Sequence, residues 1–229
     1  MNRILLTLLL TLACFLPSTK EVPMCAESLV QERVEFPRPE PSRSGLTGLL
    51  YDRKSVRSFQ DQALALDQIS RLLFAAQGVN RPGGYRTVPS AGALYPLEIF
   101  VIAGKVRSLE PGVYRFHPGS HDIVLIKEGD KRRVAAEAAL GQMWVAQAPA
   151  IFIISSVHDR VTGKYGRRGV IYAHIEAGCA AQSISLQAVE LGLGTTVVGA
   201  FQESELQEII GGSLNGVPLV LLPVGTPDR

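Results

Sequence analysis

Two arginines and a serine alternate along one short segment of the sequence. Arg53, Ser55 and Arg57 are separated by single residues, and Lys54 lies between the first two. In an extended backbone, side chains two residues apart lie on the same face, so two guanidinium groups and a hydroxyl would converge. Arginine makes bidentate, charge-assisted hydrogen bonds to phosphate oxygens. The pattern predicts a phosphate cradle, and an exposed basic loop is the open alternative.

Two further segments are rich in small residues. One is the run from Pro89 to Pro96 (PSAGALYP), and the other is a helical stretch over 173–192 followed by the glycine-bounded segment 194–201. Small side chains let a backbone approach a flat ligand closely, and on a helix they permit tight contacts, often between subunits. A plain turn before a strand and ordinary core packing are the open alternatives.

Other chemical signatures are missing from the sequence. There is no glycine-rich dinucleotide fingerprint and no P-loop, and the four histidines are scattered. The three cysteines (Cys14, Cys25 and Cys179) show no CxxC spacing, so neither a zinc site nor a disulfide framework is expected. We expect no metal site. A net charge of +2 without a charged tail gives no indication of a nucleic-acid partner.

The pattern of apolar residues predicts a mixed set of elements. We expect helices over 46–52, 65–77, 130–143, 169–191 and 202–210. We expect strands over 97–103, 112–116, 122–127, 150–155 and 217–224, a short extended piece at 195–200, and a loop over 79–96. These elements predict an α+β fold with a small central sheet flanked by helices. The strand order does not follow from the pattern.

The N-terminus predicts export. A cationic start (Met1-Asn2-Arg3) precedes a short apolar run, as in a signal peptide, and a buried helix is the alternative. We expect the signal peptide over 1–26, with a candidate lipoprotein site at Cys14. A Pro-rich linker is expected over 27–45, and one domain over 46–229. The predicted location is periplasmic, or anchored by a lipid outside the cytoplasm.

Taken in order, several segments resemble the nitroreductase superfamily, and more closely its SagB-type, thiazole/oxazole-oxidase-like dehydrogenases. The matching segments are RKSVRSF (53–59), LLFAAQGVNR (72–81), RTVPSAGALYPLEIFVI (86–102), KYG (164–166), HIEAGCAAQSISLQAVELGLGTTVVGAF (174–201) and LVLLPVGTP (219–227). Many nitroreductases carry Asn where this chain has Ala93, which favours the dehydrogenase-like branch.

The resemblance implies a nitroreductase-like, FMN-dependent fold and a homodimer with two FMN sites at the subunit interface. It assigns the FMN phosphate and ribityl chain to Arg53, Lys54, Ser55 and Arg57, with Arg229 as a late basic residue. It assigns the surroundings of the isoalloxazine ring to Pro89, Ser90, Ala91 and Gly92 and to Val198, Gly199 and Ala200. It also implies that Lys164 and Tyr165 remove a proton beside the flavin. A solvated loop is the alternative for that pair.

The expected reaction is hydride transfer between flavin N5 and a small organic or peptide-derived substrate, because the cofactor supplies the redox chemistry and the protein positions it. NAD(P)H is scarce outside the cytoplasm, so export favours a dehydrogenase. An NAD(P)H-dependent nitro or quinone reductase and a non-enzymatic, exported flavin-binding protein are the alternatives.

Overall fold

The computed structural model describes residues 45–228. The predicted signal peptide at 1–26, the candidate lipid site at Cys14, nearly all of the linker at 27–45 and the predicted phosphate ligand Arg229 lie outside these residues. None of the described helices combines the length and apolar character needed to cross a membrane.

A six-stranded antiparallel sheet forms the centre of the described domain. Its strand order is β5-β4-β3-β6-β8-β7. The bounds are β3 (Leu97–Ala103), β4 (Gly112–His117), β5 (Asp122–Glu128), β6 (Ala150–Ser156), β7 (Gly194–Thr195) and β8 (Val217–Gly225). The predicted strands at 112–116 and 122–127 form a hairpin, because β4 and β5 pair directly in antiparallel register.

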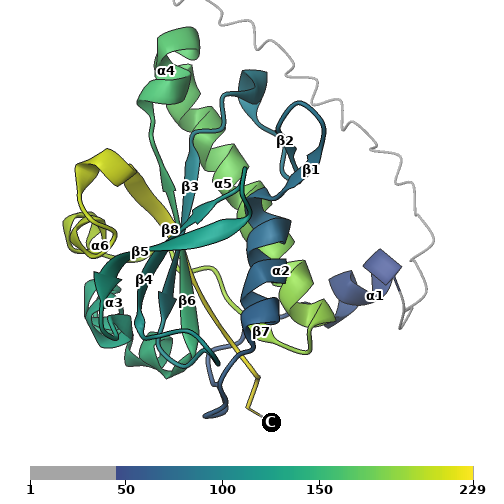
Figure 1. Ribbon diagram of the computed structural model, residues 1–229, viewed down its shortest axis with the longest axis vertical. Helices are drawn as coiled ribbons and strands as arrows, with labels where there is room; N and C mark the ends of the chain where they lie inside the picture. Colours follow the sequence, from purple (N-terminus) through teal and green to yellow (C-terminus); the bar gives the residue numbers. More distant parts are fainter. Residues whose placement is uncertain (1–44, 229) are drawn as a thin grey trace, which may run out of the picture. The chain divides into compact units, whose positions relative to one another are not determined.

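Helices cover both faces of this sheet (Figure 1). On one face lie α2 (Leu66–Gln77) and α5 (Arg168–Glu190), and on the other lie α3 (Arg132–Ala138) and α6 (Glu203–Ile209). The remaining helices are α1 (Gly45–Asp52), α4 (Asp159–Tyr165) and the short 3-10 turns η1 (Ala91–Ala93), η2 (Met143–Gln147) and η3 (Ser213–Asn215). The predicted α+β fold with a central sheet flanked by helices is confirmed.

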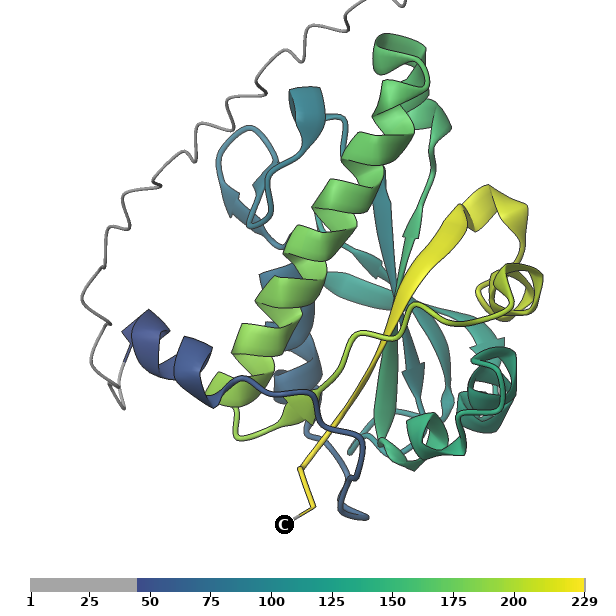
Figure 2. The same cartoon turned by 180° about the vertical axis from the view of Figure 1, so that it is seen from behind.

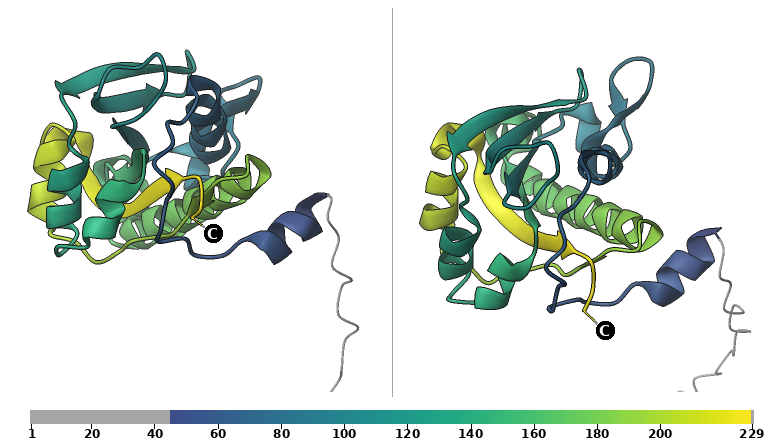
Figure 3. Two further views of the ribbon diagram at one scale, coloured as in Figure 1. Left: turned by 90° about the horizontal axis from the view of Figure 1, so that it is seen from below. Right: turned by 60° about the horizontal axis from the view of Figure 1, so that its bottom comes forward.

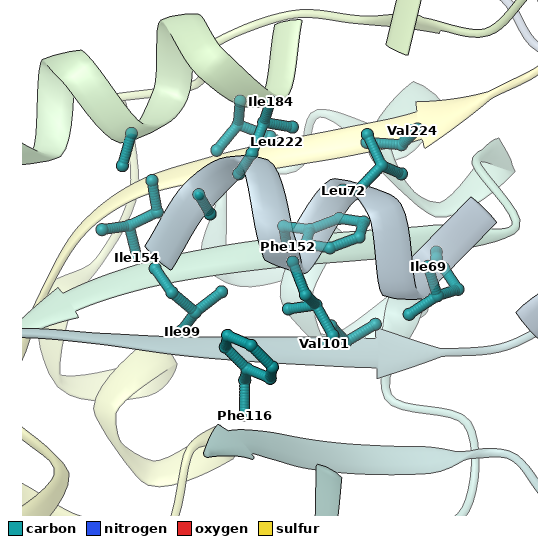
Figure 4. Packing of buried hydrophobic residues seen from close by; sticks show 14 of the residues in the cluster. Ile69, Leu72, Ile99, Val101, Phe116, Phe152, Ile154, Ile184, Leu222 and Val224 are labelled. Carbon is teal, nitrogen blue, oxygen red and sulfur yellow. The ribbon is translucent and has the colours of Figure 1, made fainter. Parts of the chain in front are cut away.

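The core consists of two apolar layers separated by the sheet. All seven residues of β3 are buried, as are all seven of β6. Alternate side chains enter opposite layers, as the pleat requires: Ile99 and Val101 face α2 and α5, whereas Phe100 and Ile102 face α3 and α6. Figure 4 shows the first layer, in which Leu72 and Ile184 from the two helices meet the strand residues. Because both faces of the central strands are covered, their sequences are apolar runs interrupted only by Glu98 in β3 and by Ser155 and Ser156 at the end of β6.

Three segments differ from the sequence-based expectation. The predicted loop 79–96 contains a small antiparallel hairpin, β1 (Val79–Arg81) and β2 (Tyr85–Arg86), whose turn uses Gly83 and Gly84 at positive φ. The predicted helix 130–143 was too long, because Leu140 and Gly141 both adopt positive φ, which an α-helix does not tolerate. The short helix α4 was not expected.

Helix α5 lies on the outside of the molecule, with no other described helix in front of it (Figure 2). Near its C-terminal end α1 projects from the domain, as the two views of Figure 3 also show. Gly169 allows α4 and α5 to cross closely, because a Cβ there would lie 2.8 Å from the backbone of Val161.

Candidate functional site

The basic segment 53–59 runs as an extended strap along the end of the sheet. Ser55 forms a parallel bridge with Thr195 of β7, and the Val56 amide donates to the Thr195 carbonyl at 3.0 Å. Val56 and Phe59 are buried and anchor the strap, whereas Lys54, Ser55 and Arg57 are exposed and Arg53 is half-buried. The extended geometry predicted for the phosphate cradle is therefore present.

The cations of this strap have no acidic partner among the residues that the structure describes. Within residues 45–228, neither Arg53, Lys54 nor Arg57 forms an ion pair with a carboxylate. The Arg57 guanidinium lies 5.9 Å from the centre of the Trp144 ring, which leaves its hydrogen-bonding groups available. Two guanidiniums, an ammonium and a hydroxyl on one extended segment form a donor set that suits a phosphate monoester.

The C-terminal strand continues along the same strap. The Gln60 amide donates to the Thr226 carbonyl at 2.9 Å, and the Asp228 amide donates to the Ser58 carbonyl at 3.0 Å. The described chain therefore ends beside the cradle. The role predicted for Arg229 stays a prediction.

The segment 198–200 begins close to the same place. Val198 makes two backbone hydrogen bonds with Leu221 of β8, at 2.8 and 2.9 Å, and its side chain is buried in the core. Gly199 and Ala200 are exposed. The backbone at 199–200 can therefore meet a ligand while Val198 fixes its position.

The loop 89–92 is held by a buried carboxylate of α5. The Ala91 amide donates to Glu176 Oε1 at 2.8 Å, and the Ser90 hydroxyl also hydrogen-bonds to this carboxylate. Ser90 Oγ in turn accepts from the Tyr95 amide at 2.9 Å. Burial raises the pKa of Glu176, and the hydrogen bonds from Ala91 and Ser90 oppose this shift.

Lys164 and Tyr165 approach the same loop. They form the last turn of α4, which Gly166 ends at positive φ. A Cβ at Gly92 would lie 2.7 Å from Tyr165 Oη and 3.0 Å from Lys164 Nζ, so both polar groups lie beside Gly92 in the space that a side chain there would occupy. The Tyr165 ring packs edge-to-face on Tyr172 of α5, with centroids 5.2 Å apart. The pair lies at a helix end that packs on α5, with Lys164 exposed and Tyr165 half-buried.

A shallow cavity of about 290 Å³ opens beside this contact. Its walls come from the loop 89–91 and one face of α5, with Tyr172, Ile175, Glu176 and Cys179 contributing side chains. Most of this wall is apolar, and the polar groups of Ser90 and Glu176 are already hydrogen-bonded to each other. The cavity therefore suits the flat, largely apolar face of a ring.

The predicted site residues form two groups rather than one. Arg53, Ser55 and Arg57 lie with 194–200 near the C-terminal end of α5, whereas Gly92, Lys164 and Tyr165 lie near its N-terminal half. The loop hydrogen-bonds to Glu176, and the β7 region hydrogen-bonds to Ala188 through the Leu193 amide. These two positions are about 18 Å apart along the helix, at the rise per residue of an α-helix. One described chain does not gather both groups around one small ligand.

Glu176 and Tyr172 were not among the predicted site residues. A signal for Glu176 existed, because an acidic residue on the small-residue face of a long helix must find hydrogen-bond donors when it is buried. Its partner lies 85 residues earlier in the chain, so the sequence pattern alone could not identify the donor.

Comparison with known proteins identifies the class. The model of the nitroreductase family matches residues 50–226. A protein of Methanocaldococcus jannaschii assigned to the nitroreductases is 43% identical over 194 residues, covering 85% of this chain and 97% of that protein. This chain belongs to the nitroreductase family, and it is an oxidoreductase of that family.

Two further similarities agree with this assignment. The crystal structure of a Ralstonia eutropha protein, also assigned to the nitroreductases, matches with a TM-score of 0.71 and 30% identity, covering 83% of this chain and 88% of that one. An FMN reductase (NAD(P)H) of Bacillus subtilis is 24% identical over 195 residues, covering 79% of this chain and 65% of that protein.

Proposed function

We propose that this chain binds FMN and catalyses hydride transfer between the flavin N5 and a small organic or peptide-derived substrate, in the manner of the SagB-type dehydrogenases. The observation that carries the proposal is the position of Lys164 Nζ and Tyr165 Oη beside Gly92. Two groups able to move a proton lie at the loop expected to border the flavin ring, beside a ring-sized cavity.

The residues of the strap fit the phosphate end of FMN. Arg53, Ser55 and Arg57 would hold the phosphate, with Lys54 alongside, because their cations have no carboxylate partner within the described chain. The loop Pro89–Gly92 and the backbone at 199–200 would border the ring. When bound, FMN would supply the redox chemistry, while Glu176 keeps the loop in place and Lys164 or Tyr165 takes the proton from the substrate.

A homodimer would bring the two groups of residues together. The strap of one protomer and the loop 89–92 of its partner would enclose one flavin, so that each dimer has two sites. Supporting this, the outer face of α5 is uncovered. It carries the exposed side chains of Ile171 and Ile175, and the exposed Gly178 follows one helical turn after Ile175. Exposed apolar residues in a row on one helix are typical of a subunit contact.

An NAD(P)H-dependent reductase is the second candidate function. The relative from Bacillus subtilis named for NAD(P)H favours it, whereas the contact of Lys164 and Tyr165 with the loop favours substrate oxidation. Export of the protein, which we also propose, would favour the dehydrogenase, because NAD(P)H is scarce outside the cytoplasm. Rapid consumption of NADPH with a nitroaromatic by the purified protein would decide for the reductase.

The first test is the visible spectrum of the purified full chain with and without added FMN. Bound flavin should give the two absorption bands of oxidised FMN, and a protein that stays colourless with excess FMN would contradict the proposal. In the coloured protein, Lys164→Ala and Tyr165→Phe should each slow bleaching by an oxidisable substrate by about 100-fold, the lower end of the range for general acid–base catalysis, while the flavin content stays unchanged. Equal rates would remove the assigned role of the pair.

A further inference from the structure

A second cavity, of about 300 Å³, lies between the start of β3, the β4–β5 hairpin and the beginning of α4. Three arginines line it against a single carboxylate. The polar residues around it include Gln77, Arg86, Glu98, Arg115, His117 and Arg160. The predicted cofactor and catalytic residues include none of these six.

Glu98 is the only acidic side chain that lines the cavity, and two arginines already saturate it. It is 8% exposed. Arg115 donates to Oε2 through Nε at 3.1 Å and through Nη2 at 3.0 Å, and Arg160 Nη2 lies 2.6 Å from Oε1. The single negative charge of Glu98 is therefore already paired with two guanidiniums, and Arg86 adds a third positive charge. The cavity retains an excess of positive charge.

Among the three arginines of the cavity, Arg86 is the one that makes no direct ion pair with a described carboxylate. Its Nη1 donates to the buried Gln77 Oε1 at 2.7 Å, and its guanidinium stacks 4.3 Å above the centre of the Tyr95 ring. It forms no ion pair with any described residue. Burial lowers the pKa of Arg86, and the more distant carboxylates of Glu98 and Glu176 oppose this shift only in part, but arginine stays protonated. A half-buried charge of this kind is costly unless an anion neutralises it.

We infer that this cavity is a binding site for a carboxylate group, held by the forked guanidinium of Arg86 with support from Arg115 and Arg160. A planar carboxylate matches the fork geometrically, since both hydrogen bonds can form in one plane. Gln77 and Tyr95 fix the fork from behind, so the site is preorganised.

The position of the cavity connects it to the proposed reaction. Arg160 also donates through Nη1 to the Tyr95 carbonyl at 3.0 Å, and Tyr95 is hydrogen-bonded to Ser90 of the flavin loop. Arg160 precedes Lys164 by four residues in α4, so both lie on the same side of that helix. A carboxylate bound here would be the anionic end of the substrate, in a reading that rests on the proposed function. The binding itself does not depend on it.

The test uses malonate as the probe and malonamide as its neutral isostere. The melting temperature of the purified full chain is followed during titration with each compound, at an ionic strength kept constant with NaCl. Malonate should raise the melting temperature saturably, because a ligand of the folded state stabilises it by mass action, and malonamide should not.

Three variants locate the site. Arg86→Gln should weaken the apparent malonate affinity at least about tenfold, as expected for loss of a charge-assisted pair. Arg86→Lys keeps the charge without the fork and should bind more weakly than the wild type; it covers the case that Arg86→Gln fails to fold. Arg133→Gln is the matched control, because Arg133 is exposed, pairs with Glu137 in α3 and does not line the cavity. Equal malonate binding by the wild type and either Arg86 variant, or equal stabilisation by malonamide, would overturn the inference.

The spectrum of bound FMN distinguishes the two sources of a carboxylate. A shift of the flavin bands on addition of malonate would identify a substrate subsite beside the ring, and an unchanged spectrum with the same melting response would identify a separate organic-acid site. A coloured protein that ignores malonate contradicts only this inference. A colourless protein whose malonate response requires Arg86 contradicts only the proposed function.

Discussion

Glu176 is a buried carboxylate whose hydrogen-bond donors both come from the loop at 90–91. At this point the backbone forms only the short 3-10 turn η1, in which Gly92 adopts a positive φ. One side chain of α5 therefore determines where the backbone of Ser90 and Ala91 lies relative to Tyr165. We regard Glu176 as a positioning residue, acting on the site through the loop.

The raised pKa of Glu176 predicts a pH-dependent contribution to stability. Burial favours its protonated form in the folded protein, so between the unfolded and folded pKa the native state binds more protons. Stability from this group is then fully present below the unfolded pKa and falls as the pH rises through the folded pKa. Urea unfolding across this acidic range should show the wild type losing stability relative to Glu176→Gln as the pH increases.

The uncharged amide keeps an acceptor for the Ala91 amide, so Glu176→Gln should remain folded. A constant difference in unfolding free energy between the two proteins at every pH would show that Glu176 does not titrate in this range.

The residues of the site could be proposed from their resemblance to a family, but their contacts could not. Nothing in the spacing of Gly92 and Lys164 indicates that they touch, because the contact depends on the unexpected helix α4 and on its crossing with α5 at Gly169. Arg86 begins one of the motifs that resemble the family, but its lack of a direct ion pair is visible only once Glu98 is seen to pair with Arg115 and Arg160.

At the scale of elements, the strap 53–59 is attached to the sheet from both sides. Its neighbours are β7 and the residues after β8, which lie far away in the sequence. The helices and strands were largely predictable from the apolar pattern, because each central strand is a predominantly apolar run. The attachment of the strap could not be predicted, because only two of its residues are buried and so few apolar positions form no periodic pattern.

Gly194 tests this attachment. A Cβ at Gly194 would lie 2.5 Å from Val56 Cγ2 and 3.0 Å from Pro227 Cγ, so the strap must move. Gly194→Ala should lower the free energy of unfolding by about 1–3 kcal/mol, the usual cost of overpacking, and should weaken FMN binding, because Ser55 and Arg57 shift with Val56.

Gly163→Ala is the matched control for stability. A Cβ there meets nothing within 4 Å, and alanine is the better helix former by up to about 1 kcal/mol. Urea titrations and FMN titrations of both variants measure the two effects. Unchanged stability and FMN affinity in Gly194→Ala would show that the strap tolerates displacement.

For the whole molecule, the decisive question is whether two chains complete one site. The cradle and the loop lie about 18 Å apart along α5, by the helical rise between Glu176 and Ala188, and the outer face of α5 is open (Figure 2). Ile175 is 56% exposed on that face and also lines the cavity beside Glu176. The surface expected to meet a partner is therefore continuous with the surface expected to meet the ring.

Ile175→Glu should separate the subunits and release the cofactor together. A carboxylate on this face would be buried without a partner in a dimer, at a cost of several kcal/mol, so the dissociation constant should rise more than about 100-fold. Sedimentation velocity would measure the mass, and the visible spectrum of the same fractions would measure bound FMN. Leu214→Glu is the control, because Leu214 is 93% exposed and lies in η3, outside the α5 face. A monomeric variant that keeps its flavin would mean that one chain suffices for binding, and a dimeric variant would place the subunit contact on another surface.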